Sequence, residues 1–199
     1  YYDDNSIATI DPNQIHLPGV FVQDQISLSK LSTILLGGRY DYNSNHGNVF
    51  SPRANYKWRS KNKKNTLRIS TGNGFRVVNL FTEEHAAFTG TRDLIVEEEL
   101  KPETSWNGNV NYVKKFLFKN DAFLSLDITG FYTYFTNQIL PDYDSDPNAI
   151  IYDNLDGFSV SQGLSLNTDL SLPNGFNILA GTTVMDVSFT EEDVTQRQM

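Results

Sequence analysis

The sequence has no cysteine and no long apolar run, and these two absences exclude several classes of protein. Of its 199 residues none is cysteine and two are methionine, so a disulfide framework and a thiolate-ligated metal site are excluded. No segment approaches the roughly 18 consecutive apolar residues of a transmembrane helix. A membrane β-barrel is still allowed, because each of its strands needs only about 10 residues of alternating polarity. The mean hydropathy of −0.40 fits a soluble protein and a barrel equally well.

Eight segments alternate between apolar and polar residues, and almost none has the period of a helix. In one of them Leu124, Leu126 and Ile128 alternate with Ser125 and Asp127. A period of two places the apolar side chains on one face of a strand and the polar side chains on the other. We therefore expect eight strands, at 20–28, 33–41, 52–58, 66–75, 104–114, 122–134, 158–170 and 176–186.

The expected connections alternate in length. Short turns are predicted at 29–31, 59–65, 116–120 and 171–175, and longer loops at 42–50, 76–103 and 135–157. This alternation is typical of an up-and-down outer-membrane barrel with short periplasmic turns and long extracellular loops. The predicted fold class is all-β: a fragment of about eight strands from an antiparallel, up-and-down transmembrane β-barrel.

Aromatic and charged residues follow the same geometry. Basic residues cluster at the short turns and acidic residues in the long loops, within a net charge of −8. Charge in loops is most simply explained by solvation, although an acidic rim would attract cationic ligands weakly. The negative balance argues against a nucleic-acid partner. Aromatic side chains near strand ends, where barrels carry interfacial girdles, are Tyr40, Trp58, Phe75, Trp106, Tyr132 and Tyr134.

Five blocks of sequence in a fixed order resemble a known family. They are GVFVQDQISLS, LLGGRYD, FSPRANYKW, TLRISTGNGFRVVNLF and ELKPETSWN, and together they cover roughly 19–106. In this order they strongly resemble the β-barrel of TonB-dependent outer-membrane receptors. The later runs FYTYFTNQI and YDNLDGFSVSQG resemble the strand and loop that follow.

The resemblance implies a function in uptake across the outer membrane of a Gram-negative cell. Members of the family import scarce ligands, such as ferric siderophores, vitamin B12 or oligosaccharides, through a plugged barrel of about 22 strands with energy passed on by TonB. The implied partners are the plug domain and remaining barrel strands of the same full-length protein, the TonB complex by way of the plug, outer-membrane lipid, and a small-molecule or oligosaccharide ligand. Residues 1–199 show no plug domain or TonB box, so we expect them to form a partial barrel domain. Neither the ligand nor its binding residues are assigned.

Seven charged residues fall on the polar parity of their strands. In a barrel they would face the lumen, where pairing with charges on neighbouring strands or contact with the plug is a simpler role than contact with a moving substrate. These lumen-facing candidates are Arg39, Asp41, Arg53, Lys57, Arg68, Asp127 and Asp169.

Asp24 breaks the alternation of its segment. It shares the parity of Val20, Val22, Ile26 and Leu28, and a carboxylate facing lipid is costly. A β-bulge that switches parity is the interpretation that we favour, although the sequence does not decide the point.

No set of residues predicts a metal site, a cofactor or catalysis. Asp142, Asp144 and Asp146 have the alternate spacing of a calcium loop, but Pro147 stands where the EF-hand form needs glycine. A second group, Glu83, Glu84 and His85, lacks a partner histidine nearby. None of the common catalytic motifs occurs, so we expect no enzyme.

The main alternative is a soluble all-β module that binds a carbohydrate or another ligand. In such a sandwich the apolar strand faces would form a buried core, whereas in a barrel they would face lipid. An isolated eight-stranded fragment would also expose two strand edges, which favours aggregation, pairing between copies or closure into a smaller barrel. The sequence leaves these outcomes open.

Overall fold

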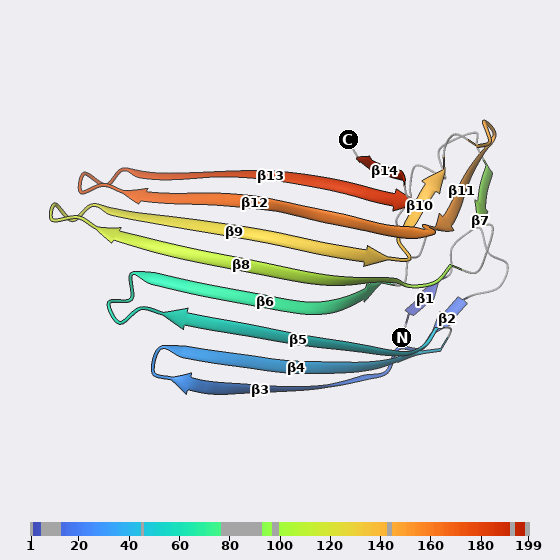
Figure 1. Cartoon of the computed structure of the whole chain (residues 1–199), viewed down its shortest axis with the longest axis horizontal. Coiled ribbons are helices and arrows are strands. Elements are labelled where there is room, and N and C mark those ends of the chain that lie inside the picture. Colours follow the sequence, from blue (N-terminus) through green and yellow to red (C-terminus); the bar gives the residue numbers. More distant parts are fainter. Residues whose placement is uncertain are drawn as a thin grey trace.

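The computed structural model describes residues 2–4, 13–44, 46–76, 93–96, 100–142, 145–191 and 194–197. These residues form strands joined by turns and contain no helix. The described part of the chain therefore has no helix that could cross a membrane. Eight long strands lie side by side in the order of the sequence, each antiparallel to its neighbours (Figure 1). The predicted up-and-down all-β fold is confirmed.

The eight predicted strands all form, most of them a few residues longer than expected. Their lengths of 11 to 15 residues exceed the roughly 10 that a membrane strand needs. They are β3 (Gly19–Ser29), β4 (Ser32–Asn43), β5 (Gly47–Arg59), β6 (Asn65–Arg76), β8 (Glu103–Leu117), β9 (Phe123–Thr136), β12 (Gly157–Ser171) and β13 (Asn177–Glu191). A short ninth strand, β14 (Val194–Arg197), pairs with the end of β13, and the sheet stays open between its two edge strands.

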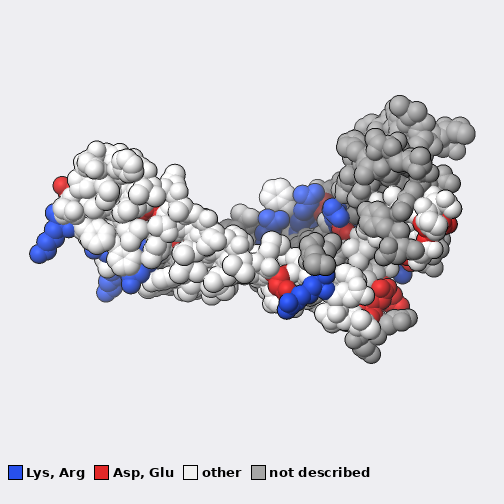
Figure 2. All heavy atoms as spheres, turned by 90° about the horizontal axis from the view of Figure 1, so that it is seen from above, with Lys and Arg blue, Asp and Glu red and all other residues white. Residues whose placement is uncertain are grey.

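Four tight turns lie together at one end of the sheet, on the left of Figure 1. Lys and Arg side chains are visible at this end in Figure 2, as the sequence predicted.

The prediction of a longer loop at 42–50 is wrong. Strands β4 and β5 continue pairing as far as Asn43 and Gly47, which leaves only residues 44–46 between them. Turn chemistry explains this, because Asn43 Oδ1 accepts a hydrogen bond from the His46 amide (3.1 Å) and Gly47 has a positive φ of 75°.

The two remaining long connections form strands of their own at the opposite end. The first contains β7 (Asp93–Val96), and the second contains β10 (Ile139–Asp142) and β11 (Ala149–Asn154). These strands pair in the order β10-β11-β7, with β11 and β7 parallel. We call them the loop sheet (Figure 1). A separate pair, β1 (Tyr2–Asp4) and β2 (Asn13–Ile15), is antiparallel.

The register of the large sheet separates an apolar face from a polar face. On the apolar face Val22 is 74% exposed, Leu164 56% and Val184 73%. Only five hydrophobic residues in the described part are buried: Ala122, at a turn, and Ile139, Ala149, Tyr152 and Leu155, in or beside the loop sheet. A soluble sandwich would bury one face of every strand, and the described residues contain no such layer.

Candidate functional site

All seven charged residues singled out from the sequence lie on the polar face. Residues directly opposite one another in an antiparallel ladder project from the same face, so the register connects them from strand to strand. Gly37 on β4 lies opposite Arg53 on β5, and Lys57 lies opposite Arg68 on β6. The series continues through Asn111 on β8 to Thr129 on β9, and Ser125 on β9 lies opposite Asp169 on β12. Period two then adds Arg39, Asp41 and Asp127 to the same face.

Arg39 and Asp41 form an ion pair within one strand. Arg39 Nε donates to both carboxylate oxygens of Asp41, at 2.9 and 2.7 Å, and Nη2 donates to Oδ1 at 2.8 Å. The Asp41 side chain is fully buried. Gly19 lies directly opposite, and a Cβ there would overlap Asp41 Oδ1. Glycine at this position therefore makes room for the buried carboxylate, whose charge is neutralised locally.

A chain of hydrogen bonds runs across β6, β8 and β9. Arg68 Nη1 donates to Asn111 Oδ1 at 2.9 Å, and Asn111 Nδ2 donates to Asp127 Oδ1 at 2.6 Å and to Thr129 Oγ1 at 2.8 Å. The Asn111 amide uses its oxygen toward the cation and its nitrogen toward the anion, so it links two opposite charges that do not touch.

The cross-strand ion pairs expected among the other candidates do not form. In the part of the chain that the structure describes, Arg53, Lys57, Arg68, Asp127 and Asp169 have no ion-pair partner. Directly opposed residues on neighbouring strands carry charges of the same sign in one case, Lys57 and Arg68. Register thus brings two like charges together, which parity alone does not reveal, and contact with the plug, the other structural role expected, stays a prediction.

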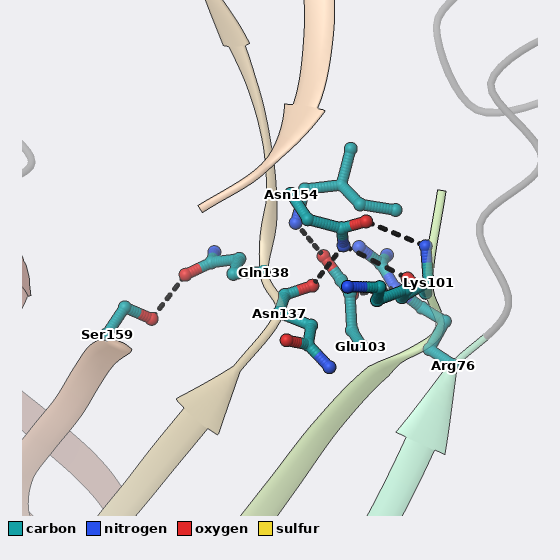
Figure 3. A network of polar contacts seen from close by, with 8 residues as sticks. Arg76, Lys101, Glu103, Asn137, Gln138, Asn154 and Ser159 are labelled. Atoms are coloured by element: carbon teal, nitrogen blue, oxygen red, sulfur yellow. Dashed lines mark hydrogen bonds and ion pairs between the residues drawn. The ribbon is translucent and has the colours of Figure 1, made fainter. Parts of the chain in front are cut away.

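A second polar site connects the loop sheet to the large sheet (Figure 3). Glu103, at the start of β8, is 5% exposed. Its Oε2 accepts from Arg76 Nε at 2.7 Å, and its Oε1 accepts from the Ile139 amide at 2.9 Å. One buried carboxylate therefore holds the end of β6 and the start of β10.

Asn154 and Gln138 complete this site. Asn154 Oδ1 accepts from the Lys101 amide at 2.7 Å, and Asn154 Nδ2 donates to the carbonyls of Lys101 and Asn137 at 3.0 and 2.8 Å. Ser159 on β12 donates to Gln138 (Figure 3). We call these residues, with Arg76 and Glu103, the Glu103 clamp. It joins both long connections to three strands of the large sheet, β6, β8 and β12.

Asp24 stays on the apolar face, so the expected bulge is not the explanation. It pairs regularly with Leu36, and the only register shift between β3 and β4 lies between Ser27 and Ser29, beyond it. Asp24 belongs to edge strand β3, whose residues are exposed throughout, so its carboxylate lies on the exposed apolar face of the sheet.

The acidic candidates in the loops have local structural roles where they are described. Asp142 Oδ1 accepts from the Ser145 amide at 3.1 Å, and Asp146 Oδ1 accepts from the Asn148 amide at 2.8 Å. These are turn contacts typical of aspartate. Asp144, Glu83, Glu84 and His85 lie outside the described residues. Within those residues, no three His, Asp or Glu side chains are grouped to hold a metal ion.

Sequence analysis missed Glu103, Asn154 and Asn111. Glu103 had a visible signal, because it follows Lys101 and Pro102 in the block ELKPETSWN, but that block was interpreted only as a loop leading into a strand. Asn154 and Asn111 had no such signal, since their partners are distant in the sequence.

Comparison with known proteins identifies the family. A family model described as "TonB dependent receptor-like, beta-barrel" matches residues 1–197. An iron-regulated outer membrane virulence protein of Vibrio cholerae is 27% identical over 121 residues, which are 60% of this chain and 18% of that protein. The chain therefore spans less than a fifth of the length of that relative.

Solved structures share the fold at low identity. The siderophore receptor PirA from Pseudomonas aeruginosa superposes with a TM-score of 0.64 at 17% identity, over 97% of this chain and 38% of that one. A ferric enterobactin receptor (PfeA) variant from the same organism has a TM-score of 0.65 at 15% identity, over 92% and 31%. With the exposed apolar face and the ordered strands, these matches show that the chain belongs to the TonB-dependent receptor β-barrel family of the Gram-negative outer membrane.

Proposed function

We propose that residues 1–199 form part of the barrel wall of a receptor that imports iron bound to a siderophore. In the complete protein, further strands close the barrel, a plug domain fills it, and TonB supplies the energy for uptake. The apolar face of the sheet contacts outer-membrane lipid, and the polar face with Arg39, Arg53, Lys57 and Arg68 lines the lumen. The chain is a partial barrel domain and does not transport alone.

The observation that carries the choice of iron is the name of the Vibrio cholerae relative, an iron-regulated outer membrane protein. The solved siderophore receptors support the fold alone and not the choice of ligand, because their identity to this chain is 17% or less. The uptake experiment below distinguishes among the classes of siderophore.

The Glu103 clamp supports a role for the loop sheet at the outer surface. In barrels of this class the tight turns lie on the periplasmic side and the long connections outside. The loop sheet lies at the end opposite the turns (Figure 1), so the clamp would hold an extracellular element that faces incoming ligand.

Uptake by the full-length receptor tests the proposal. The gene is deleted in the source cell, and uptake is measured of radiolabelled iron carried by catecholate, hydroxamate and carboxylate siderophores, of labelled vitamin B12 and of a labelled oligosaccharide. We expect loss of uptake for one class of ferric siderophore, restored by the intact gene. Unchanged uptake of iron with loss of vitamin B12 or oligosaccharide uptake would contradict the proposal.

A further inference from the structure

The four tight turns form a basic end on a chain whose net charge is −8 (Figure 1, Figure 2). Asp121 is the only acidic residue in these four turns. In the part of the chain that the structure describes, none of the basic residues at this end has an ion-pair partner. They make a surface of one sign, which attracts anions. We call the following residues the basic end: Lys30, Arg59, Lys61, Lys63, Lys64, Lys114, Lys115 and Lys119.

Hydrogen bonds hold the turn at 60–64 beside the end of β8. Asn62 Oδ1 accepts from Ser60 Oγ at 2.6 Å and from the Lys64 amide at 3.0 Å. The Lys115 amide donates to the Lys64 carbonyl at 2.8 Å. Lysines of this turn therefore lie next to those at the end of β8, and an anion between them would relieve the repulsion of their like charges.

Lys114 places one of these charges on the apolar face. It lies opposite Leu126 on β9 and, by the period of two, shares its face with Val110 and Phe116. The Lys114 Nζ lies 5.2 Å from the centroid of the Phe116 ring, which is nearer to the turn. This cation–π contact directs the ammonium toward the turn end. Lysines at the end of a lipid-facing surface extend toward the headgroups in the same way.

Exposed apolar side chains lie among the charges of the basic end. Leu117 and Phe118 follow the lysines at the end of β8, and Phe176 precedes β13. All three side chains are exposed. Aromatic and apolar side chains beside cations are typical of the boundary between a bilayer and water, where the rings enter the lipid and the cations contact headgroups.

We propose that the basic end binds an anionic phospholipid of the periplasmic leaflet, whose phosphate lies against Lys114 and the lysines of the turn at 60–64 and whose acyl chains lie on the apolar face beside Phe116. A zwitterionic headgroup neutralises these cations less well, because it carries a cation of its own. An acidic soluble protein would reach the turns, but Lys114 on the apolar face is accessible to lipid. This inference rests on the proposed function in placing the tight turns on the periplasmic side.

Native mass spectrometry of the detergent-solubilised full-length receptor tests the proposal. Dioleoylphosphatidylglycerol is the anionic probe, and dioleoylphosphatidylcholine is the reference with the same acyl chains and no net charge. We expect tighter binding of the anionic lipid. Lys63→Gln with Lys114→Gln should weaken this binding about 25-fold, at about 5-fold for each cation near a lipid surface. Binding of phosphatidylcholine should not change.

Two further variants separate a local site from a general effect of charge. Arg53→Gln with Lys57→Gln is the matched control, because it removes the same charge from exposed side chains on the polar face, and it should bind phosphatidylglycerol as the unaltered receptor does. Lys63→Arg with Lys114→Arg keeps both charges and should also bind normally. If the double glutamine variant does not fold, Lys63→Gln alone, at an exposed turn, should show the loss of about 5-fold.

Equal binding of the two lipids, or equal weakening in the glutamine variant and its matched control, would overturn the proposal. Displacement of the lipid by inorganic phosphate at constant ionic strength would also overturn it, as would binding of purified peptidoglycan through Lys63 in place of lipid. Any of these results in a receptor that still imports ferric siderophore leaves the proposed function intact. Charge-selective lipid binding in a receptor that imports no iron would support this inference and remove the proposed ligand.

Discussion

Replacing Glu103 by alanine in the full-length receptor should release the loop sheet from the barrel wall. The substitution removes the acceptor of the Ile139 amide and the charge-assisted bond from Arg76. Arg76 is 58% exposed at its side chain, so water will hydrate its released guanidinium and the ion pair itself contributes little. The larger cost is the unsatisfied Ile139 amide in a site where Glu103 is 5% exposed, about 2 kcal/mol.

Hydrogen exchange measured by mass spectrometry reports this loss locally. A loss of about 2 kcal/mol should make exchange about 30-fold faster for amides of β10 and β11 that exchange by local opening. Exchange in β12 and β13 should not change. The matched control is Asp156→Asn, which alters an exposed carboxylate two residues after Asn154 that does not belong to the clamp. Equal acceleration in both variants, or none in Glu103→Ala, would refute the role given to Glu103.

Four further substitutions test the two faces of the sheet, and the quantity measured for each is the unfolding free energy of the full-length receptor in detergent or lipid. Gly19→Ala should destabilise by about 2 kcal/mol or more, because the new Cβ overlaps the buried Asp41 carboxylate; unchanged stability would show that this carboxylate moves freely. Asp24→Leu should stabilise by up to about 2 kcal/mol by removing a carboxylate from the lipid-facing side, and a loss of stability would contradict its placement. Leu164→Arg should cost about 2 to 4 kcal/mol and its neighbour Ser165→Arg much less; equal costs would show that the faces are wrongly assigned.

The strands and their faces were predictable because they depend on local sequence. In the segment that became β9, Leu126 and Asp127 alternate with a period of two, and this period alone decides which side chains share a face. The register then follows from tight turns such as 172–176, which contains the Pro-Asn-Gly turn sequence. The loop predicted at 42–50 failed because polar residues there continue the ladder to Asn43 and Gly47.

The polar sites could not be predicted because they depend on contacts distant in the sequence. Glu103 bonds residues 27 and 36 positions away, and Asn111 joins Arg68 to Asp127 across three strands. Parity placed Lys57 and Arg68 on one face, but only the register shows that they lie opposite each other. Pairing with a charge on a neighbouring strand was one of two structural roles expected for these residues, and at this position the register brings two like charges together.

Site-directed spin labelling along β12 tests the central claim, that this sheet is a membrane wall with its apolar face in lipid. The chain has no cysteine, so single cysteines at positions 158–170 of the full-length receptor, reconstituted in bilayers, each carry one label once any cysteine elsewhere is replaced. The account predicts a period of two, with even positions such as Leu164 and Leu166 relaxed by oxygen dissolved in lipid and odd positions such as Ser165 and Asn167 not. Even positions shielded from oxygen and from a water-soluble nickel reagent alike would indicate a buried protein core and contradict the account.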